Sequence, residues 1–221
     1  KKVTNLDNVK IIYLNELIKE EFNLPNHKSL ILASGVDLEL FQNIAENEKI
    51  PNKIVFVGNL LRFGRQRNLE KILRVFQNLK EFNFTVIGGP ATESNKLINI
   101  VRELNLLNVN IKGRLSREET INEILSSSYG LLINSDDKHS RLFTSPLKYF
   151  EYLAAKLKVI AVDFPSHNLL PEQKNIYYFA NEDLESLKNS ILRASENKFI
   201  EVDIENYSLD NRVKQIINLF F

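Results

Sequence analysis

The segment from Thr144 to Lys156 reads as a helix with a clearly marked start. Ser145 is a residue type that caps helices, and Pro146 suits the first helical position. The N–H groups of a first helical turn have no partner inside the helix and carry roughly half a positive charge between them. We therefore predict an anion site here, with phosphate as its usual occupant.

An acid lies one turn further into the same helix. Glu151 is surrounded in sequence by Leu147, Phe150, Tyr152 and Leu153. Since charged side chains are seldom buried without a partner, this position indicates a binding role. The alternative is an ion pair with Lys148, three residues earlier on the same helix face.

A second group of candidate residues is basic. Arg62, Arg65 and Arg67 follow Gly58 and Asn59 within one loop. Guanidinium groups bind phosphate oxygens through paired N–H donors, so this loop is a candidate anion site too. The alternative is that the arginines only solvate a surface loop.

The surrounding pattern places these two groups together. Short apolar segments alternate with helical ones, which predicts an α/β fold: a Rossmann-like parallel sheet with helices on both faces. In the strand order 3-2-1-4-5-6, the crevice opens beyond the carboxyl ends of strands one and four. The loops there are 58–67 and 135–145, which predicts a diphosphate site. The expected strands are 53–58, 84–88, 109–113, 129–134, 158–163 and 176–180.

Several helices and three regions complete the expected layout. We predict a short N-terminal region at 1–37, a Rossmann-like domain at 38–196 and a helical tail at 197–221. The first region holds a strand at 9–14, a helix at 15–22 and an apolar run at 30–33. Further helices are expected at about 68–80, 94–105 capped by Ser94, 116–127 opened by a Ser116–Glu119 capping box, 183–196 and 209–221.

Composition excludes several classes of protein. A formal net charge of +1 over 221 residues gives no electrostatic case for nucleic acid, and no apolar run could span a bilayer. The absence of cysteine fits a reducing compartment, so we expect the cytoplasm.

Residues 136–139 (Asp-Asp-Lys-His) are interpreted as a solvated loop and His167 as structural, so no metal site is predicted. The chain begins at Lys1 and contains no Met, which we interpret as a fragment of a longer protein.

The order of several motifs resembles the C-terminal half of a retaining GT-B glycosyltransferase of the glycosyl transferases group 1 family. The resemblance covers about residues 9–196. Ser34–Asp37 and Phe41 resemble the hinge that leaves the N-terminal domain. The motifs that resemble the donor domain are Phe56–Leu60, Arg67-Asn68, Val86–Pro90, Val109–Leu115 and Ser145–Tyr152.

This resemblance implies a site for a nucleotide-diphosphate sugar donor. Glu151 would accept the ribose hydroxyls, and Arg67 would hold the diphosphate with the helix start. The same resemblance implies roles for Arg114 and Leu115 at the base and needs no metal or other cofactor. The first Glu of the family motif falls on Phe143, which puts the identity of the sugar in doubt. The full set of expected donor-site residues is Gly58, Asn59, Arg62, Arg65, Arg67, Arg114, Leu115, Thr144, Ser145, Pro146, Leu147, Lys148 and Glu151.

The implied partners are a glycan or lipid-linked acceptor and the missing N-terminal GT-B domain. The full-length protein could then associate peripherally with the inner face of the membrane. Two alternatives use the same cleft: a sugar-nucleotide epimerase and a non-catalytic nucleotide-binding subunit. A phosphoacceptor receiver domain is disfavoured, because it needs acids where Gly58-Asn59 and Gly113-Arg114 end their strands.

Overall fold

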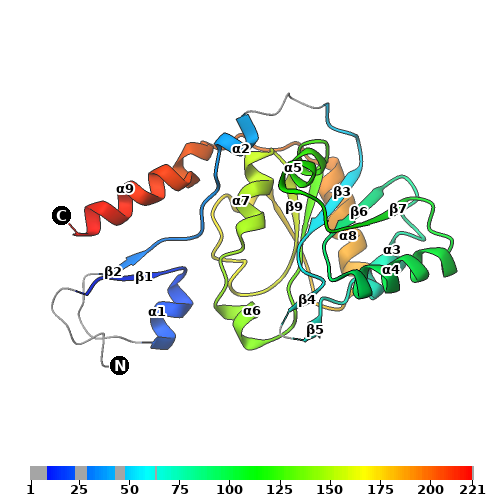
Figure 1. Cartoon of the computed structure of the whole chain (residues 1–221), viewed down its shortest axis with the longest axis horizontal. Coiled ribbons are helices and arrows are strands. Elements are labelled where there is room, and N and C mark those ends of the chain that lie inside the picture. Colours follow the sequence, from blue (N-terminus) through cyan, green and yellow to red (C-terminus); the bar gives the residue numbers. More distant parts are fainter. Residues whose placement is uncertain (1–8, 23–28, 43–47, 63, 221) are drawn as a thin grey trace.

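Six parallel strands form the central sheet of the protein in the computed structural model (Figure 1). The structure describes residues 9–22, 29–42, 48–62 and 64–220. The sheet order is β10-β9-β8-β3-β6-β7, which is the predicted 3-2-1-4-5-6 order with β3 as strand one. The strands are β3 (Lys53–Val57), β6 (Asn83–Ile87), β7 (Val109–Gly113), β8 (Tyr129–Leu132), β9 (Lys158–Val162) and β10 (Ile176–Phe179).

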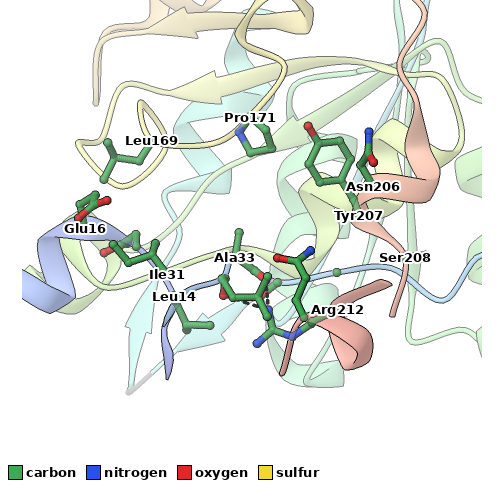
Figure 2. Close-up of a pocket in the computed structure, with 15 residues that line it drawn as sticks. Leu14, Glu16, Ile31, Ala33, Leu169, Pro171, Asn206, Tyr207, Ser208 and Arg212 are labelled. Carbon is green, nitrogen blue, oxygen red and sulfur yellow. Dashed lines mark hydrogen bonds between the residues drawn. The ribbon is translucent and has the colours of Figure 1, made fainter. Parts of the chain in front are cut away.

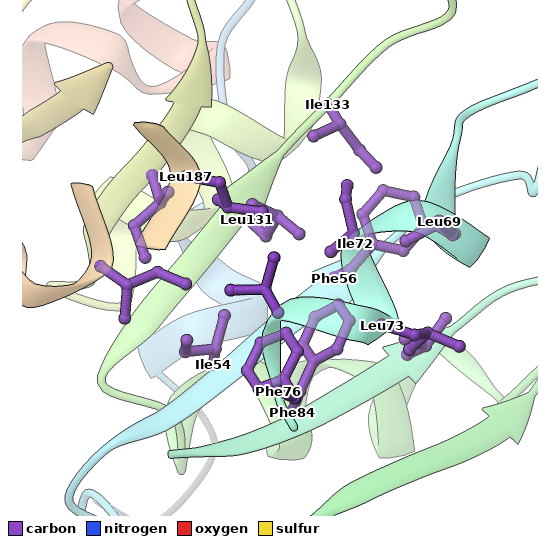
Figure 3. Close-up of a cluster of buried hydrophobic side chains, with 14 of the residues drawn as sticks. Ile54, Phe56, Leu69, Ile72, Leu73, Phe76, Phe84, Leu131, Ile133 and Leu187 are labelled. Atoms are coloured by element: carbon purple, nitrogen blue, oxygen red, sulfur yellow. The ribbon is translucent and has the colours of Figure 1, made fainter. Parts of the chain in front are cut away.

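Alternate residues of these strands enter two separate cores. In β3, Ile54 and Phe56 belong to one buried cluster, and Val55 and Val57 belong to the other. This alternation follows from the two-residue period of a strand, and a sheet buried on both faces needs apolar residues at every position. Figure 3 shows the first cluster, in which Phe76 and Phe84 stack with ring centroids 4.6 Å apart.

Helices cover both faces of the sheet, as predicted. The first cluster includes residues of α3 (Leu69–Val75), α4 (Ala91–Glu103) and α8 (Leu184–Glu196). The second includes residues of α5 (Arg117–Leu125) and α7 (Leu147–Ala154). The Ser116 capping box of α5 is confirmed, with Ser116 Oγ accepting from Glu119 N at 3.1 Å and Glu119 Oε2 accepting from Ser116 N at 2.8 Å.

Two other predicted caps are wrong. Helix α4 begins three residues before Ser94, whose hydroxyl instead donates to the carbonyl of Gly88 at 3.0 Å. Helix α7 begins at Leu147, because Pro146 has extended backbone angles and occupies the cap position itself. In both places a preceding proline with extended ψ sets the helix start, so the nearby serine is left for another contact.

The N-terminal and C-terminal segments lie together beside the main sheet (Figure 1). Strands β1 (Ile11–Tyr13) and β2 (Ser29–Ile31) form a parallel pair that accompanies α1 (Glu16–Phe22). Helix α9 (Leu209–Phe220) contacts β2, and Arg212 Nη1 donates to the carbonyls of Leu32, at 3.0 Å, and Ala33. The tail that was assigned to 197–221 therefore packs on the N-terminal segment. The division into three regions stays a prediction.

A cavity of about 400 Å³ lies between these segments and the loop around Leu169 and Pro171 (Figure 2). Two further short elements link this region to the sheet domain: α2 (Glu39–Gln42) and the 3-10 turn η3 (Ile204–Tyr207). Within the ranges that the structure describes, no helix is long and apolar enough to cross a bilayer.

Both loops at the crevice contain short elements that were not predicted. The 58–67 loop holds an antiparallel hairpin of β4 (Leu61–Arg62) and β5 (Arg65–Gln66), with Gly64 at φ 73° in its turn. The 135–145 loop holds α6 (Lys138–Leu142), where Asp137 Oδ1 accepts from Ser140 N at 2.9 Å as an N-cap. Elements of two to five residues are too short to produce a readable hydrophobic period.

Candidate functional site

A cavity of about 450 Å³ opens at the carboxyl ends of β3 and β8, the edge at which the crevice was predicted. Its wall is formed by the end of β3, the two ends of the 58–67 loop and the start of α7. Eight of the predicted donor-site residues line it: Gly58, Asn59, Arg67, Thr144, Ser145, Pro146, Leu147 and Lys148. The topology therefore brings together residues that are about 80 positions apart in the chain.

The β3 end of the cavity depends on glycine. A Cβ at Gly88 would lie 1.8 Å from the carbonyl oxygen of Gly58, so the loops after β3 and β6 can approach this closely only without a side chain at Gly88. Gly58 N also donates to Ile87 O at 3.0 Å. This close approach holds the first loop at the rim of the cavity.

The start of α7 forms the opposite wall. Tyr149 N donates to Pro146 O at 3.1 Å, so the N–H groups that the first turn leaves without a partner inside the helix are those of Leu147 and Lys148, and the positive end of the helix dipole lies at the cavity. Ser145 does not cap this turn. Its hydroxyl accepts from Ser34 N at 2.7 Å, and Ser34 Oγ donates to Ser145 O at the same distance. The residues that resemble a hinge thus hold the strand leading into the helix.

Thr144, three residues before α7, is buried and held by hydrogen bonds. Thr144 Oγ1 donates to Ser140 O at 3.1 Å. The side-chain amide of Asn15, which is buried, donates to Leu142 O at 3.0 Å and to Thr144 O at 3.2 Å. These bonds join the N-terminal segment to the cavity wall, and Asn15 is a contributor that the sequence reasoning missed.

Arg67 is the basic residue of the 58–67 loop whose described side chain lines the cavity. Its Nη1 donates to Ile133 O at 2.6 Å and to Asn134 Oδ1 at 3.2 Å, both just past the end of β8. The guanidinium carbon lies 5.9 Å from the centroid of the Phe56 ring, within the range of a cation–π contact. A half-buried guanidinium and the start of α7 therefore line the same cavity, which makes this cavity suited to an anion.

The other two arginines of the loop lie on the hairpin. Arg65 Nη1 donates to Asp136 O at 3.3 Å, its side chain is exposed, and it does not line the cavity. The backbone of Arg62 pairs with that of Arg65, and its side chain lies outside the described part of the chain. Of the two arginine side chains that the structure describes in this loop, that of Arg67 lines the cavity with the helix start and that of Arg65 does not; the phosphate roles of Arg62 and Arg65 stay predictions.

Glu151 is buried and held by two cations. Arg117 Nη1 lies 2.9 Å from Oε1, and Lys148 Nζ lies 2.5 Å from Oε2. The ion pair with Lys148 was the alternative to a binding role, and it is present. Arg117 was not predicted, and no local sequence signal links it to a residue 34 positions away. Glu151 does not line the cavity, although Lys148 does. Its contact with a ribose stays a prediction.

Arg114 and Leu115 follow β7, also at the carboxyl edge of the sheet. The Arg114 side chain lies across Gly89, where an added Cβ would be 2.6 Å from Nε. Leu115 is half-buried against the second core cluster. Neither residue lines the cavity, so their contact with a base stays a prediction.

Phe143, at the position of the motif's missing acid, lines the cavity. Its ring centroid lies 6.3 Å from that of Phe22, at the end of α1, and Lys138 Nζ lies 5.5 Å from the same centroid. The side chain therefore provides an apolar surface between α1 and α6 where a carboxylate was expected from the motif.

The acidic loop and His167 have structural partners. Asp136 accepts from Arg141 Nη1 at 3.0 Å, besides the capping role of Asp137. In the described ranges, no group of three His, Cys, Asp or Glu residues is arranged to hold a metal. His167 is fully buried, and burial lowers its pKa to about 4. Lys138 and His139 begin α6, so the interpretation of residues 136–139 as a loop is wrong at these two positions, whereas the bonds of His167 agree with its interpretation as structural.

A model of the family described as "Glycosyl transferases group 1" matches residues 51–197, well over half of the chain. Among curated proteins, none matches this sequence.

Solved structures resemble the chain at low sequence identity. A structure of an S. aureus TarM mutant with fondaparinux, alpha-GlcNAc-glycerol and UDP is 16% identical with a TM-score of 0.68, and the match covers 95% of this chain and 43% of TarM. The pneumococcal O-GlcNAc transferase GtfA in complex with UDP and GlcNAc is 14% identical with a TM-score of 0.65, over 99% of this chain and 46% of GtfA. The lipopolysaccharide outer core galactosyltransferase WaaB is 16% identical with a TM-score of 0.70, and the match covers 95% of this chain and 61% of WaaB. The chain therefore spans between 43% and 61% of these proteins.

Proposed function

The chain belongs to the glycosyl transferases group 1 family and has the Rossmann-like fold of one GT-B half, and from this premise we propose that it supplies the donor site of a glycosyltransferase. The donor in this proposal is a nucleotide-diphosphate sugar. The observation that carries it is the position of Arg67 and the start of α7 on the wall of one cavity, at the switch point of the sheet.

The proposed chemistry follows from where charge develops. As the bond between the sugar and the diphosphate breaks, negative charge grows on the departing diphosphate. Donors that are already fixed toward that charge stabilise the transition state more than the ground state. Arg67, bonded to the end of β8, and the α7 dipole are such donors. We propose that they stabilise the leaving group without a divalent ion. The proposed reaction is the transfer of a hexosyl unit with retention of configuration at its anomeric carbon.

The ribose of the donor is proposed to bind Glu151. A carboxylate has about four lone-pair sites, so its two oxygens can accept from ribose hydroxyls beside the two cations. Lys148, which lines the cavity, would then connect the ribose end of the site to the phosphate end. Arg114 and Leu115, at the same edge of the sheet, are the proposed neighbours of the base.

The finer assignments rest on the family and its relatives. UDP is present in the TarM and GtfA structures, so it is the first nucleotide to test. We propose that the full-length protein transfers its sugar to a glycan or lipid-linked acceptor, in the cytoplasm or at the inner face of the membrane. A second domain of the GT-B type is proposed to close over the donor site.

One observation favours a second candidate function. The apolar side chain of Phe143 lies on the cavity wall where the family motif has an acid. A chain that binds the nucleotide but lacks the sugar contact would be a non-catalytic subunit. One of the similar structures is of a GtfA/B complex.

The test is ligand binding followed by turnover, with residues 1–221. Thermal shifts are measured with UDP, GDP, ADP and TDP, and affinity for the best of these is measured by calorimetry. We expect binding of modest affinity without transfer from the sugar nucleotide, because water still screens an open site. No binding at millimolar concentration would refute the donor site. Turnover by these residues alone would refute the need for a second domain.

A further inference from the structure

A chain of three polar residues leads from the cavity into the core. Asn134 lines the cavity and is itself buried, directly after β8. Its Oδ1 accepts from Arg67 Nη1 at 3.2 Å, and its Nδ2 lies 3.3 Å from Nε2 of His167. The Nδ1 of His167 lies 2.8 Å from the carbonyl oxygen of Val162, at the end of β9. The chain therefore connects the guanidinium to the backbone of a central strand.

The direction of every bond in this chain is determined by its two ends. The Val162 carbonyl can only accept, so Nδ1 of His167 must carry the proton. In a neutral ring Nε2 is then an acceptor, and the side-chain amide of Asn134 must donate to it. This orientation turns Oδ1 of Asn134 toward Arg67, a donor-only group. Burial lowers the pKa of His167, so the ring is neutral at pH 7 as this arrangement requires.

We propose that Asn134 and His167 are positioning residues that hold the Arg67 guanidinium toward a bound diphosphate. The inference rests on the proposed function and adds to it two residues that were not among the predicted donor-site residues. Long arginine side chains lose rotamer entropy when a ligand orders them, and an anchor that already fixes one end reduces that loss. The Asn134 oxygen and the Ile133 carbonyl both bond Nη1, so they act as this anchor.

The first test separates positioning from general stability. Calorimetry compares a nucleoside diphosphate, UDP first, with its nucleoside. We expect Asn134→Ala to weaken UDP binding about fivefold to tenfold, because the Ile133 carbonyl still holds Nη1 of Arg67 and only one of its two anchoring bonds is lost, and to change uridine binding less than about twofold. The matched control is Asn175→Ala, which removes another buried asparagine, bonded to the backbone of Ile200. This control should lose stability but keep the wild-type ratio of UDP to uridine affinity.

A pair of histidine variants tests the direction of the chain. A glutamine amide reaches the position of Nε2, so His167→Gln can still accept from Asn134 and should retain selectivity for UDP. An asparagine amide reaches only the position of Nδ1, so His167→Asn keeps the bond to Val162 and loses the contact with Asn134. We expect His167→Asn to show the same reduced ratio of UDP to uridine affinity as Asn134→Ala. Equal UDP selectivity in both histidine variants would overturn the role of His167.

A measurement on the unmodified protein tests the inference even if these variants fail to fold. Nitrogen-15 NMR of the His167 ring at pH 7 should show a protonated Nδ1 and an unprotonated Nε2; the opposite tautomer would overturn the inference. Arg67→Ala distinguishes the two proposals. If the wild type binds UDP and Arg67→Ala does not, while Asn134→Ala binds it normally, the positioning inference alone is wrong. If the wild type binds none of the four diphosphates, the proposed function fails as well.

Discussion

The ammonium of Lys148 lies 2.5 Å from Oε2 of Glu151, one turn inside α7, so the acid of the predicted ribose site is an ion-pair partner of a cavity-lining residue. Arg117 bonds the other oxygen. Each carboxylate oxygen bonds one cation and keeps a further lone pair that can accept from a hydroxyl group.

Replacing Glu151 with glutamine tests this site. We expect Glu151→Gln to weaken binding of the nucleoside diphosphate by about 1–3 kcal/mol, the range for hydrogen bonds to a charged group. Titration calorimetry measures the change. The matched control is Glu123→Gln, because Glu123 also pairs with two lysines, Lys53 at 2.9 Å and Lys112, and lies away from the cavity. Unchanged affinity in a folded Glu151 variant would rule out the ribose role.

Replacing Arg67 tests the phosphate end. Arg67→Ala should weaken binding of a nucleoside diphosphate by about 1.5–3 kcal/mol and leave its nucleoside nearly unaffected, since only the former presents charge to the guanidinium. We expect a smaller effect from Arg65→Ala, because Arg65 does not line the cavity. An exposed arginine of α4, Arg102, provides a neutral control. Equal losses for both ligands would place Arg67 outside the phosphate site.

Acid should destabilise the protein through His167. The ordinary pKa of 6.5 is lowered to about 4 in the folded state, so between these values the unfolded chain binds a proton that the folded chain excludes. The free energy of unfolding should therefore fall as pH drops from 6.5 to 4, by about 2–3 kcal/mol from this group. Urea unfolding at pH 7, 6, 5 and 4.5 measures it.

The control for this effect is a non-titrating variant. His167→Gln should have a flatter dependence of stability on pH than the wild type over the same window. Nearby Asp163 favours the charged ring and so reduces the effect of burial. If the free energy of unfolding depends on pH in the same way for the wild type and His167→Gln, the folded protein does not prevent protonation of His167.

Gly130 should not tolerate a side chain. A Cβ there would lie 2.3 Å from the ring of Tyr152, which is fully buried and accepts a hydrogen bond from Val57 N at 3.2 Å. Gly130→Ala should therefore cost about 1–3 kcal/mol or more in urea unfolding, as for other overpacked cores. Combining it with Tyr152→Ala, which removes the ring, should cost less than the sum of the two. Additive losses would show that ring and backbone do not meet.

The sequence by itself determined the sheet and the place of the cavity. Each strand is a short apolar run and each crossover carries a helical pattern, and right-handed parallel connections leave few topologies open. The order with β3 beside β8 then places the loop of Arg67 opposite the start of α7. The capping box at Ser116 was also readable, because both of its partners lie within four residues.

Only the tertiary structure decided which side chains meet. Ser145 bonds Ser34 rather than its own helix, Glu151 bonds Arg117, and Arg67 bonds Asn134. These partners are 111, 34 and 67 positions apart, so no local propensity or period encodes them. They form because parallel strands bring their carboxyl ends to one edge, where buried polar groups must find partners that the chain supplies from distant loops.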